Sequence, residues 1–379
     1  MALDRFEVRV SIQKVLLGLV LVIVPLSIVG LVLTTRSDSA LDASIGSHLK
    51  TMAQMYSNNL SHEVSDRVSA VKLIAADPGV VEAVTAANRA YQNQNEAAIS
   101  DKLDKAEKTW ETPQAAPAVK SLLTSKPSET LRHYHEMDQQ MLRITVTDER
   151  GVPIAATAKP SRYTLTTFGP WQSVYNGGKG AVSISNILFD EPTKAYFVDI
   201  GVPVTEAGTG QLAGVALASV NISPLLASFQ QDTIGNGWKA YLVNSDGTVV
   251  SGPRTDVFAR ARSDEFAAIG DSLGSLEGRQ TGYVTADLQS GRHIVGFSDT
   301  GLDKTYKNLA WTVLISQDEH EATAPIRSLS LFAIVMVVLA LFMVTLLAVY
   351  YALHRKQQFA DIEEAASLGQ QGLTPPQAV

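Results

Sequence analysis

The sequence predicts an α+β protein: a long N-terminal helix followed by two tandem modules built on antiparallel sheets, with a transmembrane helix on either side. Three observations predict this class. Charge-free apolar runs lie near both ends, the spacing of apolar residues changes from helical to alternating at Met141, and a strand leading into an acidic, glycine-ended hairpin occurs twice.

The two apolar runs cover residues 15–35 and 328–353, and no charged residue interrupts either run. A helix that crosses a bilayer needs about 20 mostly apolar residues, and both runs reach that length. They predict two transmembrane helices that hold residues 36–327 on one side of a membrane.

The charges beside the runs predict which side that is. Lys and Arg residues occur in both flanking segments, 1–14 and 354–379. Positive residues beside a span stay in the cytoplasm, so residues 36–327 are expected outside, in the periplasm of a bacterium whose inner membrane the chain crosses twice. A cleaved signal peptide is the alternative for the first run. That run is longer than a signal-peptide core, and no small-residue cleavage site follows it.

The composition excludes several classes of function. The formal net charge of −7 and the pI near 5.5 argue against a nucleic-acid partner. The chain has no cysteine, which rules out disulfides, thiol catalysis, iron–sulfur clusters and cysteine-ligated zinc. No cofactor is predicted.

Residues 36–140 are predicted to be helical. Apolar residues recur every three or four positions from Leu41 to Val71, the pattern of one long amphipathic helix. Pro78 and Gly79 end this pattern, and shorter segments separated by prolines follow.

Residues 141–229 and 239–320 are predicted to form the two sheet modules. The first has strands at 142–148, 152–156, 181–188, 195–204 and 212–221, then a short helix at 224–229. The second has strands at 239–244, 248–251, 282–286, 293–298 and 311–316. Each begins with a strand and an acidic hairpin that ends in glycine, a weak internal duplication that favours two modules over one large sheet.

In this order, the pieces resemble the double Cache (dCache) sensor domain of bacterial chemoreceptors and sensor kinases. The resemblance covers roughly residues 36–327. It rests on the long helix with its Ala-Ala-Asp-Pro-Gly break, the two hairpins, Trp171, the glycine turn at 177–180, Val202-Pro203-Val204 and the final strand from Trp311. It implies two PAS-like modules and a ligand pocket in module 141–229, the one farther from the membrane.

The resemblance also implies particular site residues. Family members that bind amino acids have an Arg two residues before a pocket Trp, a Tyr directly after it and an Asp later in the module. Here Gly169, Gln172 and Asn221 occupy those positions around Trp171. Without the guanidinium and the carboxylate, a standard amino acid is expected to be an unlikely ligand.

The candidate site residues are then those at the matching positions: Tyr163, Trp171 and Asp190, with Gln172 and Asn221 as neutral substitutes. They predict a pocket for a small neutral or weakly polar ligand, held by stacking and amide hydrogen bonds. The alternative is that Tyr163 and Trp171 are core residues and the pocket is filled.

Other candidates for chemistry are weak. His133 and His135 share a face on a strand but diverge on a helix, and their surroundings predict a helix. No third ligand is near in sequence, so no metal site is predicted. Nothing resembles a nucleophile elbow or a P-loop, and the protein is not expected to be an enzyme.

The resemblance implies an output domain after the second span. Segment 354–379 is short for such a domain. The predicted function is therefore a membrane-anchored sensor of a small molecule that signals through a homodimer or a separate partner protein. The alternative is an envelope interaction or scaffold protein that uses a Cache-like domain without a small ligand.

Overall fold

The computed structural model describes residues 12–231, 237–275, 281–323, 334–335, 337–346 and 348–349. The chain divides into two compact units, Met1–Ser44 with Glu319–Val379, and Ile45–Asp318. Among the described residues, no helix combines the length and the apolar character that a membrane crossing requires. The predicted cytoplasmic segment 354–379, most of segment 1–14 and part of the second predicted span lie outside the described residues.

The long amphipathic stripe forms helix α1 (Ile12–Ala75). From Leu49 to Ile74, the apolar side chains at three- and four-residue spacing are buried. The helix ends before Pro78, and the Asp77 side chain accepts hydrogen bonds from the Gly79 and Val80 amides, which caps helix α2. The helices that follow are α2 (Pro78–Arg89), α3 (Glu96–Thr109), α4 (Ala116–Leu123) and α5 (Lys126–Met137).

The distal sheet, which we define as the sheet of module 141–229, is antiparallel with strand order β2-β1-β6-β5-β3, and β4 also pairs with β5. Its strands are β1 (Met141–Asp148), β2 (Pro153–Ala156), β3 (Ser183–Ile184), β4 (Leu188–Asp190), β5 (Ala195–Thr205) and β6 (Leu212–Asn221). Two short helices belong to it, α6 (Gly169–Tyr175) and α7 (Ser223–Ala227). The single strand expected at 181–188 is thus two short strands. Between them the Ser185 amide donates to the Asp199 carbonyl, and the Ser185 hydroxyl, in place of a backbone carbonyl, accepts the Asp199 amide.

The proximal sheet, that of module 239–320, has the order β8-β7-β11-β10-β9. Its elements are β7 (Lys239–Asn244), β8 (Val249–Ser251), α8 (Asp264–Ser275), β9 (Thr281–Leu288), β10 (Gly291–Asp299) and β11 (Trp311–Asp318). Both sheets start with a hairpin whose glycine has a positive φ, 75° at Gly151 and 80° at Gly247. The two antiparallel sheets confirm the α+β class and its duplication.

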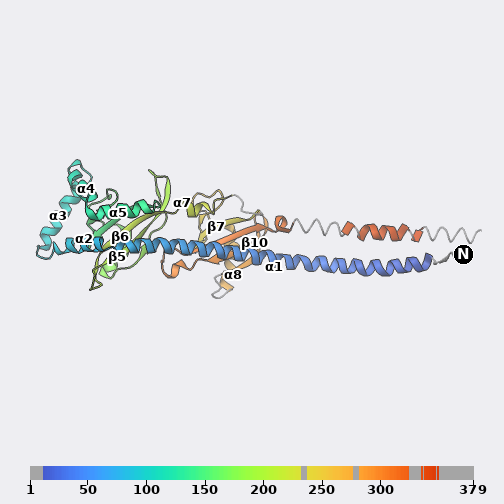
Figure 1. The fold of residues 1–379 in the computed structure, drawn as a ribbon. Coiled ribbons are helices and arrows are strands. Elements are labelled where there is room, and N and C mark those ends of the chain that lie inside the picture. The colour runs from blue at the N-terminus through green and yellow to red at the C-terminus, as the bar shows by residue number, and fades with distance from the viewer. Residues whose placement is uncertain are drawn as a thin grey trace, which may run out of the picture. The chain divides into compact units, whose positions relative to one another are not determined.

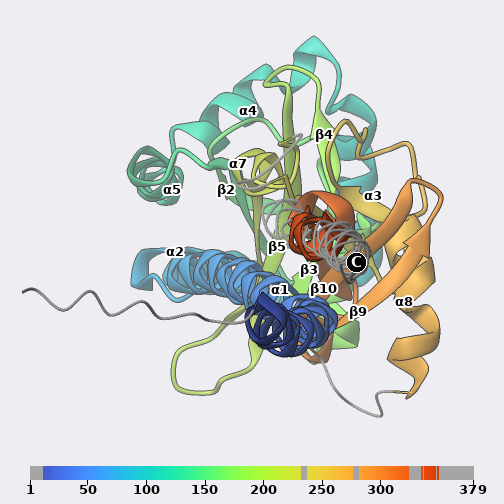
Figure 2. The ribbon, with the colours of Figure 1, turned by 90° about the vertical axis from the view of Figure 1, so that its right-hand side faces the viewer.

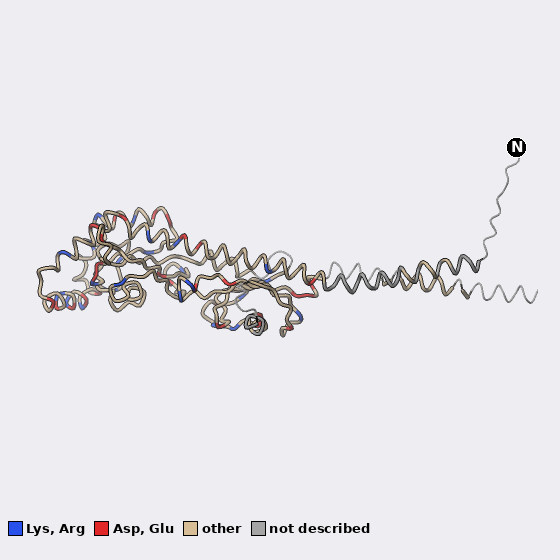
Figure 3. Tube along the Cα trace, turned by 90° about the horizontal axis from the view of Figure 1, so that it is seen from below, with Lys and Arg blue, Asp and Glu red and all other residues tan. Residues whose placement is uncertain are grey.

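One core joins α1 to both sheets, and Figure 1 shows α1 running along both of them. Each sheet carries its own cover on the other face. Residues of α1 pack with Ile144 and Val220 of the distal sheet and with Leu242 and Val313 of the proximal sheet. Helix α6 covers the opposite face of the distal sheet. Helix α8 covers that of the proximal sheet, and Figure 2 shows it beside β9 and β10. Lys and Arg are interspersed with Asp and Glu along this unit (Figure 3).

Candidate functional site

The face of the distal sheet that lies beneath α6, here called the α6-side face, carries an unusual mixture of side chains. Alternate residues of a strand point to opposite faces, so the apolar residues that pack on α1 alternate with a second set. This second set comprises Arg143, Thr145 and Thr147 of β1, Phe197, Asp199 and Gly201 of β5, and Val215, Leu217 and Ser219 of β6.

One half of the α6-side face is apolar and closed. Trp171 and Val174 of α6 pack on Val215 and Leu217. The Trp171 indole N–H donates to the Thr147 hydroxyl at 2.8 Å. At Gly201 an added Cβ would lie 2.3 Å from the Val174 side chain, so α6 sits directly on the sheet at this point.

The other half of the α6-side face is charged. Strand register places Arg143 opposite Ser219 and Ser219 opposite Asp199, which makes one row across β1, β6 and β5. We call it the Arg143–Ser219–Asp199 row. The Ser219 hydroxyl donates to Asp199 Oδ1 at 2.6 Å, and only 6 % of Asp199 is exposed. A carboxylate in the middle of a sheet face is costly to bury unless it has partners.

A second carboxylate meets the Arg143 end of this row. Arg143 Nη1 lies 3.1 Å from Asp190 Oδ1, and the guanidinium lies over the Phe197 ring at 5.4 Å from its centroid. Asp190 also accepts hydrogen bonds from the Thr193 amide and hydroxyl at 3.2 and 2.7 Å. The Arg143 side chain is 44 % exposed, so solvent and small molecules reach it.

The environments of the two carboxylates shift their pKa values in opposite directions. Burial raises the pKa of Asp199, while the Ser219 hydrogen bond and the Arg143 charge act against that rise. Hydrogen bonds from Thr193, helped by Arg143, lower the pKa of Asp190. The Arg143 guanidinium thus lies beside one carboxylate whose pKa is lowered and in one row with another whose pKa is raised.

The structure brings only two of the five predicted site residues to the α6-side face, Trp171 and Asp190. They lie in different halves of it, because Thr147, the partner of Trp171, is four residues along β1 from Arg143, roughly 13 Å at the rise of a strand. The predicted role of both residues in ligand binding stays a prediction.

The other three predicted residues lie elsewhere. Tyr163 packs edge-on against Trp110, with ring centroids 5.3 Å apart, and burial raises its pKa. Gln172 is exposed and donates to the Thr166 carbonyl at 2.8 Å. Asn221 accepts the Ser223 amide at 2.9 Å and lines a cavity on the α1 side of the sheet.

Sequence reasoning missed Arg143, Ser219 and Asp199. One signal was present, since Asp199 is the single charged residue in the otherwise apolar strand β5. Such a residue is rarely buried without a partner or a function. The partners themselves depend on strand register, which the sequence did not supply.

A family model described as Cache domain matches residues 37–326. The chain belongs to the Cache domain family. This confirms the resemblance drawn from the sequence. No curated protein matches the Cache chain in sequence.

Solved structures share the fold of this Cache chain. The sensory domain of the Campylobacter jejuni chemoreceptor Tlp3 with isoleucine bound has 11% sequence identity and a TM-score of 0.50, and the match covers 76% of this chain and 97% of that one. A second structure of the Tlp3 sensory domain has 12% identity and a TM-score of 0.50, covering 76% and 99%. The ligand-binding domain of the Pseudomonas aeruginosa PAO1 amino acid chemoreceptor PctC with GABA has 16% identity and a TM-score of 0.45, covering 72% and 100%.

These structures correct one expectation. The prediction that a standard amino acid is an unlikely ligand is wrong, because the Tlp3 sensory domain, which matches this Cache chain, is solved with isoleucine bound. The prediction considered only the positions of Gly169, Gln172 and Asn221. The α6-side face carries a guanidinium and two carboxylates at positions outside that motif, on Arg143, Asp190 and Asp199.

Proposed function

We propose that the chain is an extracytoplasmic sensor of small molecules, anchored in a membrane, that passes its signal to a partner protein. The ligand binds on the α6-side face, at the Arg143–Ser219–Asp199 row and Asp190. The observation that carries this proposal is a partly exposed guanidinium, 3.1 Å from one carboxylate and in one row with a second, buried one, within a Cache domain.

The row has the chemistry to hold a polar or zwitterionic molecule, amino acids included. A guanidinium binds a ligand carboxylate through two parallel hydrogen bonds, and a carboxylate such as Asp190 or Asp199 binds an ammonium group. The aromatic ring of Phe197 offers an apolar wall beside Arg143.

The ion pair between Arg143 and Asp190 does not prevent such binding. A partly exposed pair contributes about 0–1 kcal/mol, whereas a hydrogen bond to a charged group contributes about 1.5–3 kcal/mol. A ligand that offers both a carboxylate and an ammonium group therefore replaces one weak pair with two stronger contacts.

The anchoring part of the proposal is supported by the charge-free runs at 15–35 and 328–353 and by the Lys and Arg residues that flank them. They favour two passes through the inner membrane with the Cache domain in the periplasm. Ligand binding would then favour one of two arrangements of the membrane helices, by the difference in ligand affinity between them. We propose no enzymatic role.

The test is a thermal-shift screen of the full chain against amino acids, amines and small carboxylates. A true ligand raises the melting temperature by an amount set by its concentration relative to its Kd. We expect Arg143→Met, which keeps an unbranched side chain but removes the guanidinium, to abolish the shift. Arg89→Met, an exposed arginine of α2, is the control and should leave it unchanged.

Two outcomes would count against the proposal. A shift that survives in Arg143→Met places the ligand elsewhere. A folded chain that no compound stabilises favours the alternative of an envelope scaffold, and the search would turn to protein partners.

A further inference from the structure

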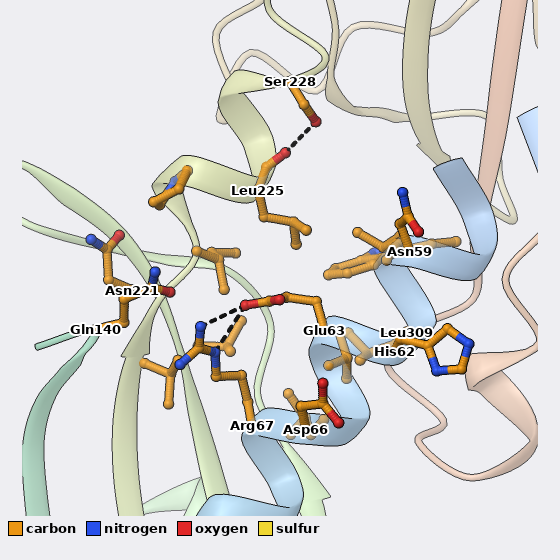
Figure 4. Close-up of a pocket in the computed structure, with 18 of the residues that line it drawn as sticks. Asn59, His62, Glu63, Asp66, Arg67, Gln140, Asn221, Leu225, Ser228 and Leu309 are labelled. Carbon is orange, nitrogen blue, oxygen red and sulfur yellow. Dashed lines mark hydrogen bonds and ion pairs between the residues drawn. The ribbon is translucent and has the colours of Figure 1, made fainter. Parts of the chain in front are cut away.

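A cavity lies on the α1 side of the distal sheet, where α1, the ends of β5 and β6, α7 and residues Leu309 and Trp311 come together (Figure 4). We call it the junction cavity. Its volume is about 780 Å³. Protein interiors hold few voids larger than a water molecule, and ligand pockets span about 300–1,000 Å³.

The junction cavity is separated from the α6-side face by the sheet itself. Val198 and Ile200 of β5 line the cavity, and Asp199 between them points the other way. Val220 of β6 lines the cavity next to Ser219, which faces Asp199. A molecule in one site therefore cannot touch the side chains of the other.

The interior of the junction cavity is apolar and aromatic. Leu60 and Val64 of α1 face the sheet, and Leu225 of α7 points in from the opposite side (Figure 4). The rings of Tyr56 and Phe229 meet edge to face at 5.7 Å. The face of an aromatic ring attracts an organic cation as well as apolar groups.

The charged side of the cavity is acidic. Glu63, Asp66 and Arg67 line it from successive turns of α1. Arg67 is already paired, with Glu63 at 2.6 Å and with Asp138 at 2.5 Å. The two carboxylates and one guanidinium of the lining leave a net charge of −1, and Asp138, which pairs with Arg67 from outside the lining, adds one more negative charge nearby. This balance favours a positive ligand.

We propose that the junction cavity is a second binding site, which takes a small organic cation with an ammonium group and an apolar or aromatic body. The ammonium group lies between Glu63 and Asp66, and the body packs on Leu225 and Val220. Asn59 at the rim and Asn221 beside the sheet supply neutral hydrogen-bond partners. Because α1 forms one wall and α7 the other, an occupant adds contacts between these helices.

The experiment titrates the full chain with 2-phenylethylammonium by calorimetry, beside the neutral 2-phenylethanol and the anionic 3-phenylpropionate. We expect saturable binding of the ammonium compound, roughly tenfold tighter than that of the alcohol, because charge-assisted hydrogen bonds are lost in the alcohol. The carboxylate should bind more weakly than both. Equal affinity for the three compounds would overturn the assignment of a cation.

Variants then locate the probe. Leu225→Trp fills the cavity and should abolish binding. Asp66→Asn, at an exposed position that folding tolerates, should weaken it about tenfold. Glu82→Gln, an exposed carboxylate of α2, is the matched control and should change nothing.

Asp199→Asn separates this proposal from the proposed function. It should leave binding of the probe unchanged, since Asp199 faces away from the cavity. Loss of probe binding in Asp199→Asn, with binding retained in Asp66→Asn and Leu225→Trp, would place the probe on the α6-side face and refute a second site. An absence of any probe binding would refute it as well, while leaving the sensor proposal to its own screen.

Discussion

The distal and proximal sheets share a strand order but bury different rows beneath their covering helices. In the distal sheet the row across β1, β6 and β5 is Arg143–Ser219–Asp199. At the matching positions of the proximal sheet, counted back from the two equivalent hairpins, register aligns Lys239 with Ser316 and Ser316 with Val295 across β7, β11 and β10. The next row toward the hairpin aligns Tyr241 with Leu314 and Leu314 with Phe297. This row packs with Ile269 of α8 in an apolar cluster.

The difference shows that the fold does not need a buried carboxylate in this row, because Val295 takes the place of Asp199 in the proximal sheet. The proximal sheet closes this face with aromatic and aliphatic side chains, which stabilise by about 25 cal/mol for each Å² of apolar surface buried. A buried aspartate has no such gain and must be compensated by its partners. The distal row is therefore better explained by ligand binding than by stability, in line with the proposed function.

The largest expected effect comes from placing a polar group in the apolar row. Leu314 is fully buried, so Leu314→Asn removes a well-packed side chain and buries an amide without partners. We expect a loss of about 3–5 kcal/mol in the free energy of unfolding, measured by urea denaturation. Leu314→Met, which conserves volume, should cost less than about 1.5 kcal/mol. A similar loss in both variants would mean that shape and not polarity decides this row.

The next effect concerns how α1 meets the two sheets. At Gly296 of β10 an added Cβ would lie 2.4 Å from the backbone of Leu49, whereas the distal sheet leaves the junction cavity beside α1. Gly296→Ala should therefore destabilise the domain by about 2–3 kcal/mol and lower Tm by roughly 5–10 °C. Gly270 in α8 has open space, and Gly270→Ala should raise stability by up to about 1 kcal/mol. A tolerated Gly296→Ala would show that α1 is free to move away from β10.

The sequence predicted the elements whose pattern is long and periodic. The stripe of α1 repeats over many turns, and the alternating strands bury one face, so both were recognised, and their order led to the Cache family. Helix α6 was missed because it has seven residues and begins with Gly169 and Pro170, which lack a helical pattern.

The candidate site was less predictable, because register brings together residues far apart in the chain. Arg143, Asp199 and Ser219 come from three strands, and no local motif links them. The positions matched to the family predicted a pocket near Trp171, where the structure has a closely packed apolar cluster. A charge in an apolar strand, as at Asp199, was the more informative signal.

A smaller effect tests whether Trp171 only packs on the sheet or also contacts the ligand. Trp171→Phe loses the hydrogen bond to Thr147 and part of the indole volume, and we expect a cost of about 1–2 kcal/mol in unfolding free energy. Ligand affinity should change less than in Arg143→Met, because Trp171 lies in the closed half of the α6-side face. Loss of binding without loss of stability would instead make Trp171 a direct ligand contact.

The smallest effect is a pair of opposite pH dependences within the charged row. Burial raises the pKa of Asp199 above the ordinary 3.8, so the folded chain holds this proton more tightly than the unfolded chain. The resulting stability is fully present below about pH 3.8 and is lost as pH rises through the folded-state pKa. Asp190 has a lowered pKa, so its contribution is present above about pH 3.8 and is lost as pH falls through that lowered value.

Unfolding free energies of the wild type, Asp199→Asn and Asp190→Asn, measured between about pH 3 and 7, should separate these signs. Relative to wild type, Asp199→Asn should gain stability as pH rises, and Asp190→Asn should lose it. Leu314→Met in the proximal sheet is a useful comparison, because neither side chain titrates and its stability relative to the wild type should not change with pH. If the two aspartate variants changed in the same direction, the two carboxylates would share one environment. The charged row would then be a simple ion-pair network, with no buried carboxylate kept for a ligand.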